Sequence, residues 1–158
     1  MLVDLMERYE ARIYTFTLTL LGNADLALDC TQDTFLRAYM HLSKGRVVTG
    51  SWLYAVARNR AMDEFRRLRN AASGDELQHH EAPEAPTDLR MTVQAAFSRL
   101  QAVDREVLYL FAVAGFRTEE IGVMLGIRGS AVRQRLYRAR QHFRAVYDVD
   151  TAEQCKED

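Results

Sequence analysis

The sequence predicts an all-α protein in which two small helical domains, the second a helix-turn-helix, are joined by a flexible linker. Apolar residues recur every three or four positions along almost the whole chain, which is the period of an amphipathic helix. Both prolines lie in one segment, residues 71–88, where Leu77 is the single large apolar residue. Hydrophobic residues make up 48% of the 158-residue chain, so a packed core is expected.

The first domain, residues 1–70, is predicted to hold three helices. The first covers residues 2–21, and Asn23 can cap a second helix that reaches about residue 42. After a break, a third helix covers about residues 52–69. One arc of this helix is apolar and is expected to face the core, with Tyr54, Ala57, Ala61, Phe65 and Leu68. The opposite arc carries Trp52, Val56, Asn59, Asp63, Arg66 and Arg67.

Residues 71–88 hold five acids and no base. Such a segment cannot bury enough apolar surface to offset the entropy of ordering it, so a flexible acidic linker is predicted. The second domain, residues 89–147, is expected to contain four helices, at about residues 89–100, 105–114, 119–125 and 131–147. The expected N-caps of the last three are Asp104, Thr118 and Ser130. Residues 148–158 are predicted to form an acidic tail.

The composition argues against several classes of protein. The longest nearly apolar run, residues 107–116, is far shorter than the roughly 20 residues that cross a bilayer, so no membrane insertion is expected. The N-terminus lacks the basic and then apolar layout of a secretory signal, which predicts a cytoplasmic protein. Cys30 and Cys155 give neither a disulfide framework nor a metal half-site. The His79-His80 pair has no third ligand nearby, so no metal or other cofactor is expected.

The net charge of −1 conceals an uneven distribution. Residues 44–69 hold seven bases and two acids, a net charge of +5, and residues 128–144 hold six arginines and no acid, a net charge of +6. The rest of the chain carries −12. Two basic segments predict two separate contact surfaces for a polyanion. The alternative is a pair of solvated helix faces, although such faces normally mix the two signs.

The stretch from Thr118 to Arg133 has the order of a helix-turn-helix: a short helix, a glycine at the turn, the apolar Ile127 and a second helix. One arc of the second helix is apolar and is expected to face the core, with Val132, Leu136, Ala139 and Phe143. The outer arc is left to arginine and glutamine. These types bind guanine and adenine edges in the major groove, at about 1–3 kcal/mol per contact. Repressors and response regulators share this motif.

The chain resembles, over nearly its full length, the small extracytoplasmic-function (ECF) group of the sigma-70 family of bacterial sigma factors. Its C-terminal part carries Arg105-Glu-Val-Leu, Glu120-Ile-Gly, Leu125-Gly-Ile and Ala131-Val-Arg-Gln-Arg-Leu-Tyr-Arg-Ala-Arg, similar to the fourth conserved region, which reads the minus-thirty-five element. The resemblance implies DNA contacts from Ser130, Arg133, Gln134, Arg135, Tyr137, Arg138 and Arg140. The helical wheel places Arg135 nearer the buried side, so it ranks lower.

The N-terminal part resembles two further segments of the family. Asp29-Cys-Thr-Gln-Asp-Thr-Phe-Leu-Arg-Ala is similar to the segment that docks on the clamp helices of the polymerase's largest subunit. It implies contacts from Asp29, Gln32, Asp33 and Phe35. Ser51-Trp-Leu-Tyr-Ala-Val-Ala-Arg-Asn-Arg-Ala-Met-Asp-Glu-Phe-Arg-Arg resembles the segment that recognises and melts the minus-ten element. It implies contacts from Lys44, Arg46, Trp52, Asn59, Asp63, Arg66 and Arg67. Trp52 is at least as often a packing anchor at such a position.

By this resemblance the protein is a sigma factor that directs promoter recognition, DNA melting and transcription initiation, without catalytic chemistry of its own. Its implied partners are core RNA polymerase, through the clamp helices and the flap of the second subunit, promoter DNA and an anti-sigma factor. One alternative is a conventional helix-turn-helix regulator with an N-terminal dimerisation or ligand domain. The other is an enzyme, which is disfavoured because the sequence has no Ser-His-Asp order, glycine-rich phosphate loop or metal-ligand spacing.

Overall fold

The protein is all-α over the part that the structure, a computed structural model, describes. The backbone is described for residues 1–71 and 88–154, and the side chains for residues 1–71 and 93–148. The chain divides into two compact units, Met1–His80 and Glu81–Asp158. The segment expected to be a linker lies almost entirely outside the described residues, as do Cys155 and the His79-His80 pair.

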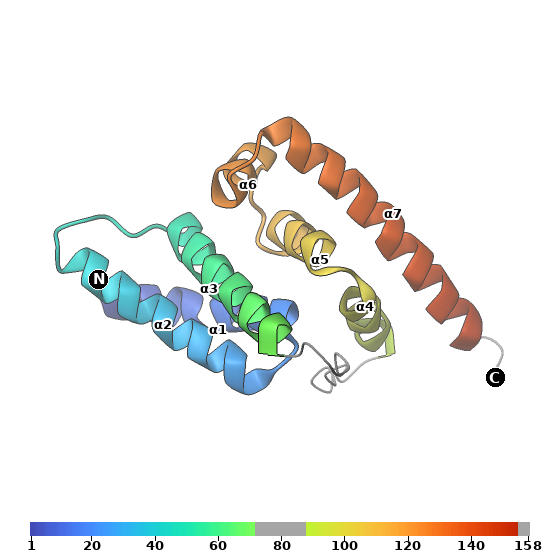
Figure 1. Cartoon of the computed structure of the whole chain (residues 1–158), viewed down its shortest axis with the longest axis horizontal. Coiled ribbons are helices and arrows are strands. Elements are labelled where there is room, and N and C mark those ends of the chain that lie inside the picture. The colour runs from blue at the N-terminus through green and yellow to red at the C-terminus, as the bar shows by residue number, and fades with distance from the viewer. Residues whose placement is uncertain (72–87, 155–158) are drawn as a thin grey trace. The chain divides into compact units, whose positions relative to one another are not determined.

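The first unit consists of three packed helices, α1 (Leu2–Leu21), α2 (Ala24–Leu42) and α3 (Gly50–Ala71). Each packs against the other two, and in Figure 1 α2 and α3 lie along one another with a long loop joining them at one end. The side chains that are fully buried between them are Ile13, Phe16, Leu20, Ala27, Cys30, Ala38, Leu53, Ala57 and Ala61. Burial of these apolar side chains is the main stabilising term of the unit.

Local capping signals set the helix ends of this unit. The Leu26 backbone N–H donates to Oδ1 of Asn23 at 3.0 Å, which confirms the predicted N-cap of α2. At the other end of α2 the chain turns at Gly45, whose φ of +72° is in the left-handed region. The Gly45 N–H donates to the Leu42 carbonyl and the Arg46 N–H to the His41 carbonyl, the pattern of a Schellman motif.

The buried face of α3 is wider than the sequence predicts. Tyr54, Ala57 and Ala61 are buried as expected, but Leu53 and Glu64 are buried as well, and Phe65 is only half-buried. The reason is that α3 packs against both α1 and α2, so its inner face covers more than a single arc. The helix also begins earlier than predicted, at Gly50, because the Thr49 hydroxyl oxygen accepts a hydrogen bond from the Trp52 N–H at 3.2 Å.

The second unit consists of α4 (Asp88–Arg99), α5 (Ala102–Leu108), a π-helical turn η1 (Tyr109–Val113), α6 (Thr118–Leu125) and α7 (Gly129–Gln154). The long helix α7 packs against α4, α5 and α6, which follow one another along its length in Figure 1. Val132, Leu136 and Ala139 face the interior as predicted, and Phe143 is half-buried, with its ring 5.4 Å from the ring of Phe97.

Three helix starts in this unit differ from the sequence prediction. Asp104 is not an N-cap: α5 begins at Ala102, and Asp104 lies in its first turn with the side chain directed to α7. Thr118 is the first residue of α6, where Glu120 Oε2 accepts from the Arg117 N–H at 2.7 Å and supports the helix start instead. Ser130 lies inside α7, which begins at Gly129.

The helix α7 also continues past its predicted end. It reaches Gln154, so most of the segment predicted as an acidic tail is helical, and only residues 155–158 lie outside the described residues. No glycine or proline follows Tyr147 to stop the helix. Within the described part of the chain, no helix is long and apolar enough to span a membrane.

Candidate nucleic-acid interface

The outer face of α7 carries the residues predicted to read duplex DNA. Its predicted contacts are exposed, namely Ser130, Arg133, Gln134, Tyr137, Arg138 and Arg140, whereas Arg135 is half-buried, in agreement with its lower rank. A shallow open hollow on this face is lined by Arg133, Gln134, Tyr137 and Arg138. The Tyr137 hydroxyl oxygen accepts from Nε2 of Gln141 at 2.9 Å, one helical turn further. This face therefore presents hydrogen-bonding groups at two successive turns.

Two of these arginines also contact neighbouring elements. Arg133 Nη1 lies 3.6 Å from Oε1 of Glu119 on α6, and the Arg140 guanidinium lies 5.1 Å from the centre of the Phe111 ring. The pKa of Glu119 is lowered, first by a hydrogen bond from its own backbone N–H and then by the Thr118 hydroxyl. An ionised Glu119 restrains Arg133 without burying it, and Arg140 keeps its donors exposed while the ring supports its flat face.

The turn between α6 and α7 is close-packed. Gly126 ends α6 at a φ of +68°, in the left-handed region that favours glycine. The Ile127 N–H then donates to the Gly122 carbonyl at 2.9 Å, and a Cβ added at Gly122 would lie 2.7 Å from the Ile127 carbonyl oxygen. The two helices thus meet at a close-packed corner, where Val132 faces the interior and Arg133 and Gln134, in the same turns of α7, remain exposed.

The outer face of α3 carries most of the second predicted DNA surface. Asn59, Asp63, Arg66 and Arg67 are exposed on it. Arg66 Nη1 lies 3.3 Å from Asp63 Oδ1 in a solvent-exposed pair. The loop between α2 and α3 adds Lys44 and Arg46, both exposed. The surface joins a basic loop to a mixed polar helix face, which suits phosphates and base edges together.

Trp52 is both packed and accessible. It is half-buried at the start of α3, and its ring stacks on the His41 ring of α2, with the ring centres 4.7 Å apart and the planes 30° from parallel. That geometry is typical of an offset aromatic stack. The packing expected of a tryptophan at a helix start is therefore present, and the residue as a whole remains partly exposed. The sequence did not single out His41.

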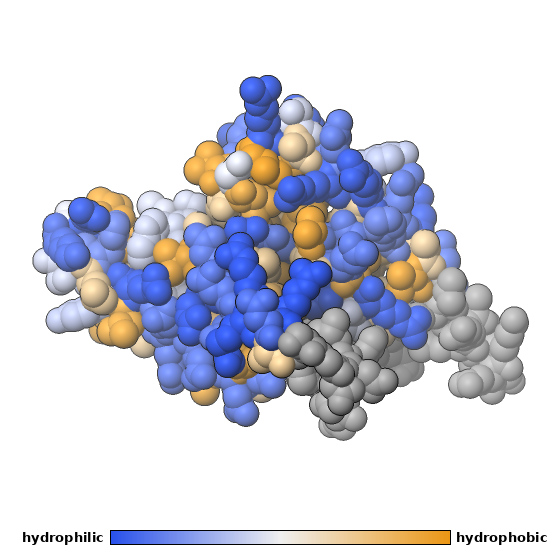
Figure 2. Space-filling view, in the orientation of Figure 1, coloured by the Kyte–Doolittle hydropathy of each residue, from blue (hydrophilic) through white to orange (hydrophobic). Residues whose placement is uncertain are grey.

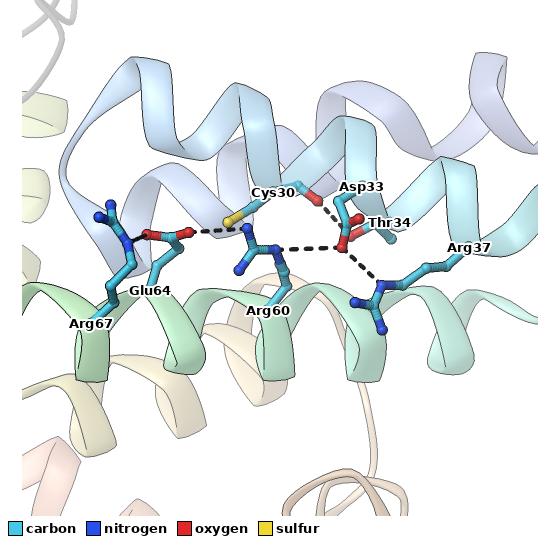
Figure 3. Close-up of polar contacts among 7 residues, drawn as sticks. All are labelled: Cys30, Asp33, Thr34, Arg37, Arg60, Glu64 and Arg67. Carbon is cyan, nitrogen blue, oxygen red and sulfur yellow. Dashed lines mark hydrogen bonds and ion pairs between the residues drawn. The ribbon is translucent and has the colours of Figure 1, made fainter.

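An ionic network links α2 to α3 (Figure 3). Asp33 Oδ2 lies 2.8 Å from Arg37 Nε and 3.4 Å from Arg60 Nε. Arg60 Nη2 lies 3.0 Å from Glu64 Oε1, and Glu64 Oε2 lies 2.9 Å from Arg67 Nε. Arg60 thus bridges a carboxylate on each helix. The sequence indicates part of this network, because Arg60, Glu64 and Arg67 are spaced by four and three positions along α3 and charges at those spacings are neighbours on a helix.

The exposed side of α2, which we call the α2 outer face, includes most of the predicted polymerase contacts. Asp29 and Gln32 are exposed, and Asp33 is 29% exposed at its edge. Phe35 is only 6% exposed, because its side chain points into the core of the unit, so it shapes the helix packing and offers a partner little surface. The sequence prediction missed the exposed apolar members of this face, which are Leu28, Leu36, Tyr39 and Met40.

Cys30 lies beneath the ionic network and is fully buried. Burial raises the pKa of its thiol to about 11, while the nearby Arg60 guanidinium offsets part of that rise. The thiol is therefore neutral in the folded protein at physiological pH and acts as a small apolar core side chain. Among the described residues, no group of three or more His, Cys, Asp and Glu side chains lies close enough together to hold a metal ion.

The second unit exposes apolar surface of its own. Figure 2 shows apolar surface gathered where α6 lies, between hydrophilic areas. Val123 on α6 is 85% exposed, and Val113 at the end of η1 is also largely exposed. Valine side chains do not bind DNA phosphates, so this apolar surface differs in chemistry from the basic outer face of α7.

Two helical units, each with an exposed basic surface and one with a helix-turn-helix, define a DNA-binding protein of the transcription machinery. Residues 5–71 match the model of sigma-70 region 2, and residues 90–143 match that of sigma-70 region 4. The chain belongs to the ECF group of the sigma-70 family, whose members direct RNA polymerase to promoters in transcription initiation.

Several curated proteins are similar to the chain along most of its length. It is 34% identical to the RNA polymerase sigma factor CarQ of Myxococcus xanthus, with 90% of this chain and 87% of CarQ covered. It is 30% identical to the ECF sigma factor SigL of Mycobacterium tuberculosis, with 85% and 82% covered. It is 29% identical to the ECF sigma factor SigE of Mycolicibacterium smegmatis, where 95% of this chain spans 64% of that relative.

The fold also matches a solved structure. The sigma factor RpoE of Bartonella quintana, crystallised with the anti-sigma factor NepR, superposes with a TM-score of 0.72 at 22% sequence identity, covering 93% of this chain and 96% of that one. This likeness establishes the all-α fold of a sigma factor.

Proposed function

We propose that the two units of this sigma factor bind different states of the promoter while core polymerase holds them together. The second unit binds the intact minus-thirty-five duplex through α7. The first unit docks on polymerase through the α2 outer face and binds the opened minus-ten strand through α3 and the preceding loop. The observation that carries the proposal is the presence of an exposed basic surface on each of two separate units.

At the minus-thirty-five element, two of the side chains that line the open hollow of α7, Arg133 and Gln134, read base edges. Arg133 and Gln134 lie in the first turns of the helix, and a helix that enters the major groove contacts bases mainly through its N-terminal turns. Arg138 and Arg140, further along, bind phosphate, as does the Ser130 hydroxyl. Tyr137, held by Gln141, contacts the sugar-phosphate backbone.

At the minus-ten element, the first unit binds single-stranded DNA. Lys44, Arg46 and Arg66 attract the phosphates, and Asn59 and Asp63 bind the edge of an unpaired base. Trp52 offers the open part of its ring to a base. Arg67 already pairs with Glu64, so its charge is shared between that carboxylate and the DNA.

Docking on core polymerase uses both polar and apolar members of the α2 outer face. Asp29, Gln32 and Asp33 suit the arginine-rich clamp helices of the largest subunit. Leu28, Leu36 and Tyr39 supply the apolar area that a stable interface needs. The apolar surface at Val113 and Val123 of the second unit binds the flap of the second subunit.

An anti-sigma factor is a further partner in this proposal. The solved relative RpoE is bound to the anti-sigma factor NepR. A protein that covers the α2 outer face or the apolar surface on α6 would keep this chain away from polymerase. The chain itself contributes binding and no catalysis, and it acts in the cytoplasm, where polymerase and DNA are found.

The test is reconstitution with purified core polymerase. The full chain is expected to copurify with core enzyme and to direct run-off transcription from defined start sites, while the free chain binds promoter DNA weakly because the tether and polymerase supply effective concentration. A conventional helix-turn-helix regulator would instead bind a duplex operator tightly without polymerase. Failure to bind core enzyme, or promoter affinity of the free chain equal to that of the holoenzyme, would contradict the proposal.

A further inference from the structure

His41 contacts the loop at residues 44–49 and the ring of Trp52 at the same time. Its carbonyl oxygen accepts from the backbone N–H groups of Lys44 at 3.3 Å and of Arg46 at 3.2 Å. Its ring stacks on Trp52 at 4.7 Å between centres. The backbone of His41 therefore fixes the start of the loop, and its side chain reaches across to the helix that follows the loop.

The far end of the loop is fixed as well. Val48 is buried in the core of the unit, and the Thr49 hydroxyl oxygen accepts from the Trp52 N–H at 3.2 Å. The loop thus holds the backbone of Trp52, and His41 on α2 holds its ring. The two exposed bases, Lys44 and Arg46, lie between these anchors.

We propose that His41 is a positioning residue for capture of the opened strand: its ring holds Trp52 at the angle at which one face receives an unpaired base. The inference rests on the proposed function of the first unit and deepens it. A ring covered on one side by a fixed partner keeps a defined open face, whereas an unsupported tryptophan would sample several rotamers and lose entropy on binding. His41 is not itself required to touch DNA.

The experiment compares wild-type, His41→Ala and His41→Phe chains assembled with core polymerase. The probe is a labelled single-stranded oligonucleotide that carries the minus-ten sequence of a promoter mapped by run-off transcription. His41→Ala is expected to bind it about three- to tenfold more weakly, the range of an aromatic pair, and His41→Phe to restore most of the affinity. A duplex carrying only the minus-thirty-five element should bind equally to all three.

Two further measurements separate positioning from loss of fold. Trp52 is the only tryptophan of the chain, so the emission of the free full-length protein reports directly on its ring. His41→Ala should change that emission while the urea midpoint of the helical signal stays close to that of wild type. Ser43→Ala is the matched control, because its exposed hydroxyl donates to the Met40 carbonyl, away from the Trp52 ring stack; it should alter neither emission nor affinity.

The outcomes distinguish this inference from the proposed function. If wild-type holoenzyme does not bind the oligonucleotide, the role proposed for the first unit is wrong, and this inference with it. If wild type binds and His41→Ala binds equally well, the positioning role alone is overturned. Equal weakening by His41→Ala and His41→Phe would also overturn it, because the ring stack would then not be the cause.

Discussion

His142 on α7 lies with Nδ1 2.6 Å from Oδ2 of Asp104 on α5, although 38 positions separate the two residues in the chain. Asp104 is buried, and the His142 side chain is 59% exposed. The contact fixes the middle of the long helix α7 against α5. It therefore helps to set how α7 lies on the rest of the unit, with its basic face outward.

Replacing His142 by alanine should destabilise the second unit by about 1–3 kcal/mol, because it leaves the buried Asp104 without this partner. In urea, the loss should appear in the far-ultraviolet circular dichroism and not in the emission of Trp52, which lies in the first unit. Ala145→Ser, at an exposed position on the same helix, is the control. An unchanged dichroism midpoint would show that the pair contributes nothing to stability.

Arg60→Ala should destabilise the first unit by about 1–3 kcal/mol, because it removes one of the two arginines that pair with the buried Glu64 in the network of Figure 3. The unfolding of this unit can be followed in urea by Trp52 emission. Arg66→Ala is the comparison, since its pair with Asp63 is exposed and should contribute less than about 1 kcal/mol. Equal losses for the two variants would contradict a bridging role for Arg60.

Cys30 should resist alkylation in the folded chain. Its thiol is buried and its pKa is raised to about 11, so at pH 8 little thiolate is present and little of it is accessible. In a Cys155→Ser background, iodoacetamide should modify Cys30 slowly in buffer and quickly in urea, as followed by intact mass. Rapid modification of the folded chain would show that this part of the core opens readily.

The same shift predicts how stability depends on pH. The unfolded thiol titrates near its ordinary value of 9.0 and the folded thiol at about 11, so between these values the unfolded state has released more protons than the folded state. The contribution of Cys30 is therefore present in full below about pH 9 and is lost as the pH rises toward about 11. Cys30→Ala should flatten this part of the curve of unfolding free energy against pH. If the slope there were unchanged, the pH dependence would come from other titrating groups.

Substitutions on α7 should separate base reading from phosphate binding. Gln134→Ala should weaken holoenzyme binding by about 1–3 kcal/mol and relax the preference at one base pair of the minus-thirty-five element. Arg140→Ala should weaken binding to all sequences alike and reduce the slope of affinity against salt by about 1. Affinities over a set of single-base promoter variants at two salt concentrations provide the check. A sequence-specific defect in Arg140→Ala would reverse the assignment.

Leu36→Glu should weaken binding to core polymerase by at least about tenfold. The side chain is 58% exposed on the α2 outer face, so the change leaves the core intact and places a charge in the proposed apolar contact. Val3→Glu on α1, also exposed, is the control and should bind normally. Binding can be measured by competition for labelled core enzyme. Normal affinity of Leu36→Glu would show that polymerase does not contact the α2 outer face at this residue.

The predicted helices and the helix-turn-helix were largely correct because their signals are local. The spacing of Ile13, Phe16 and Leu20 predicts the inner face of α1, and the Asn23 cap and the turn at Gly126 depend on residues a few positions away. The predicted caps at Asp104, Thr118 and Ser130 were wrong. Each of these residues lies within two positions of the observed helix start, and a local sequence pattern does not fix the end of a helix more precisely than that.

By itself, the sequence determined the all-α class, the helix-turn-helix and the two basic segments, because helix periodicity and charge are properties of short stretches of chain. Only the tertiary structure decided that Glu64 is buried against α2, that Phe35 points inward while Leu36 points outward, and that His41 supports Trp52. Each of these depends on which side chains of another helix lie opposite. That information comes from the packing of residues distant in sequence, which no local pattern contains.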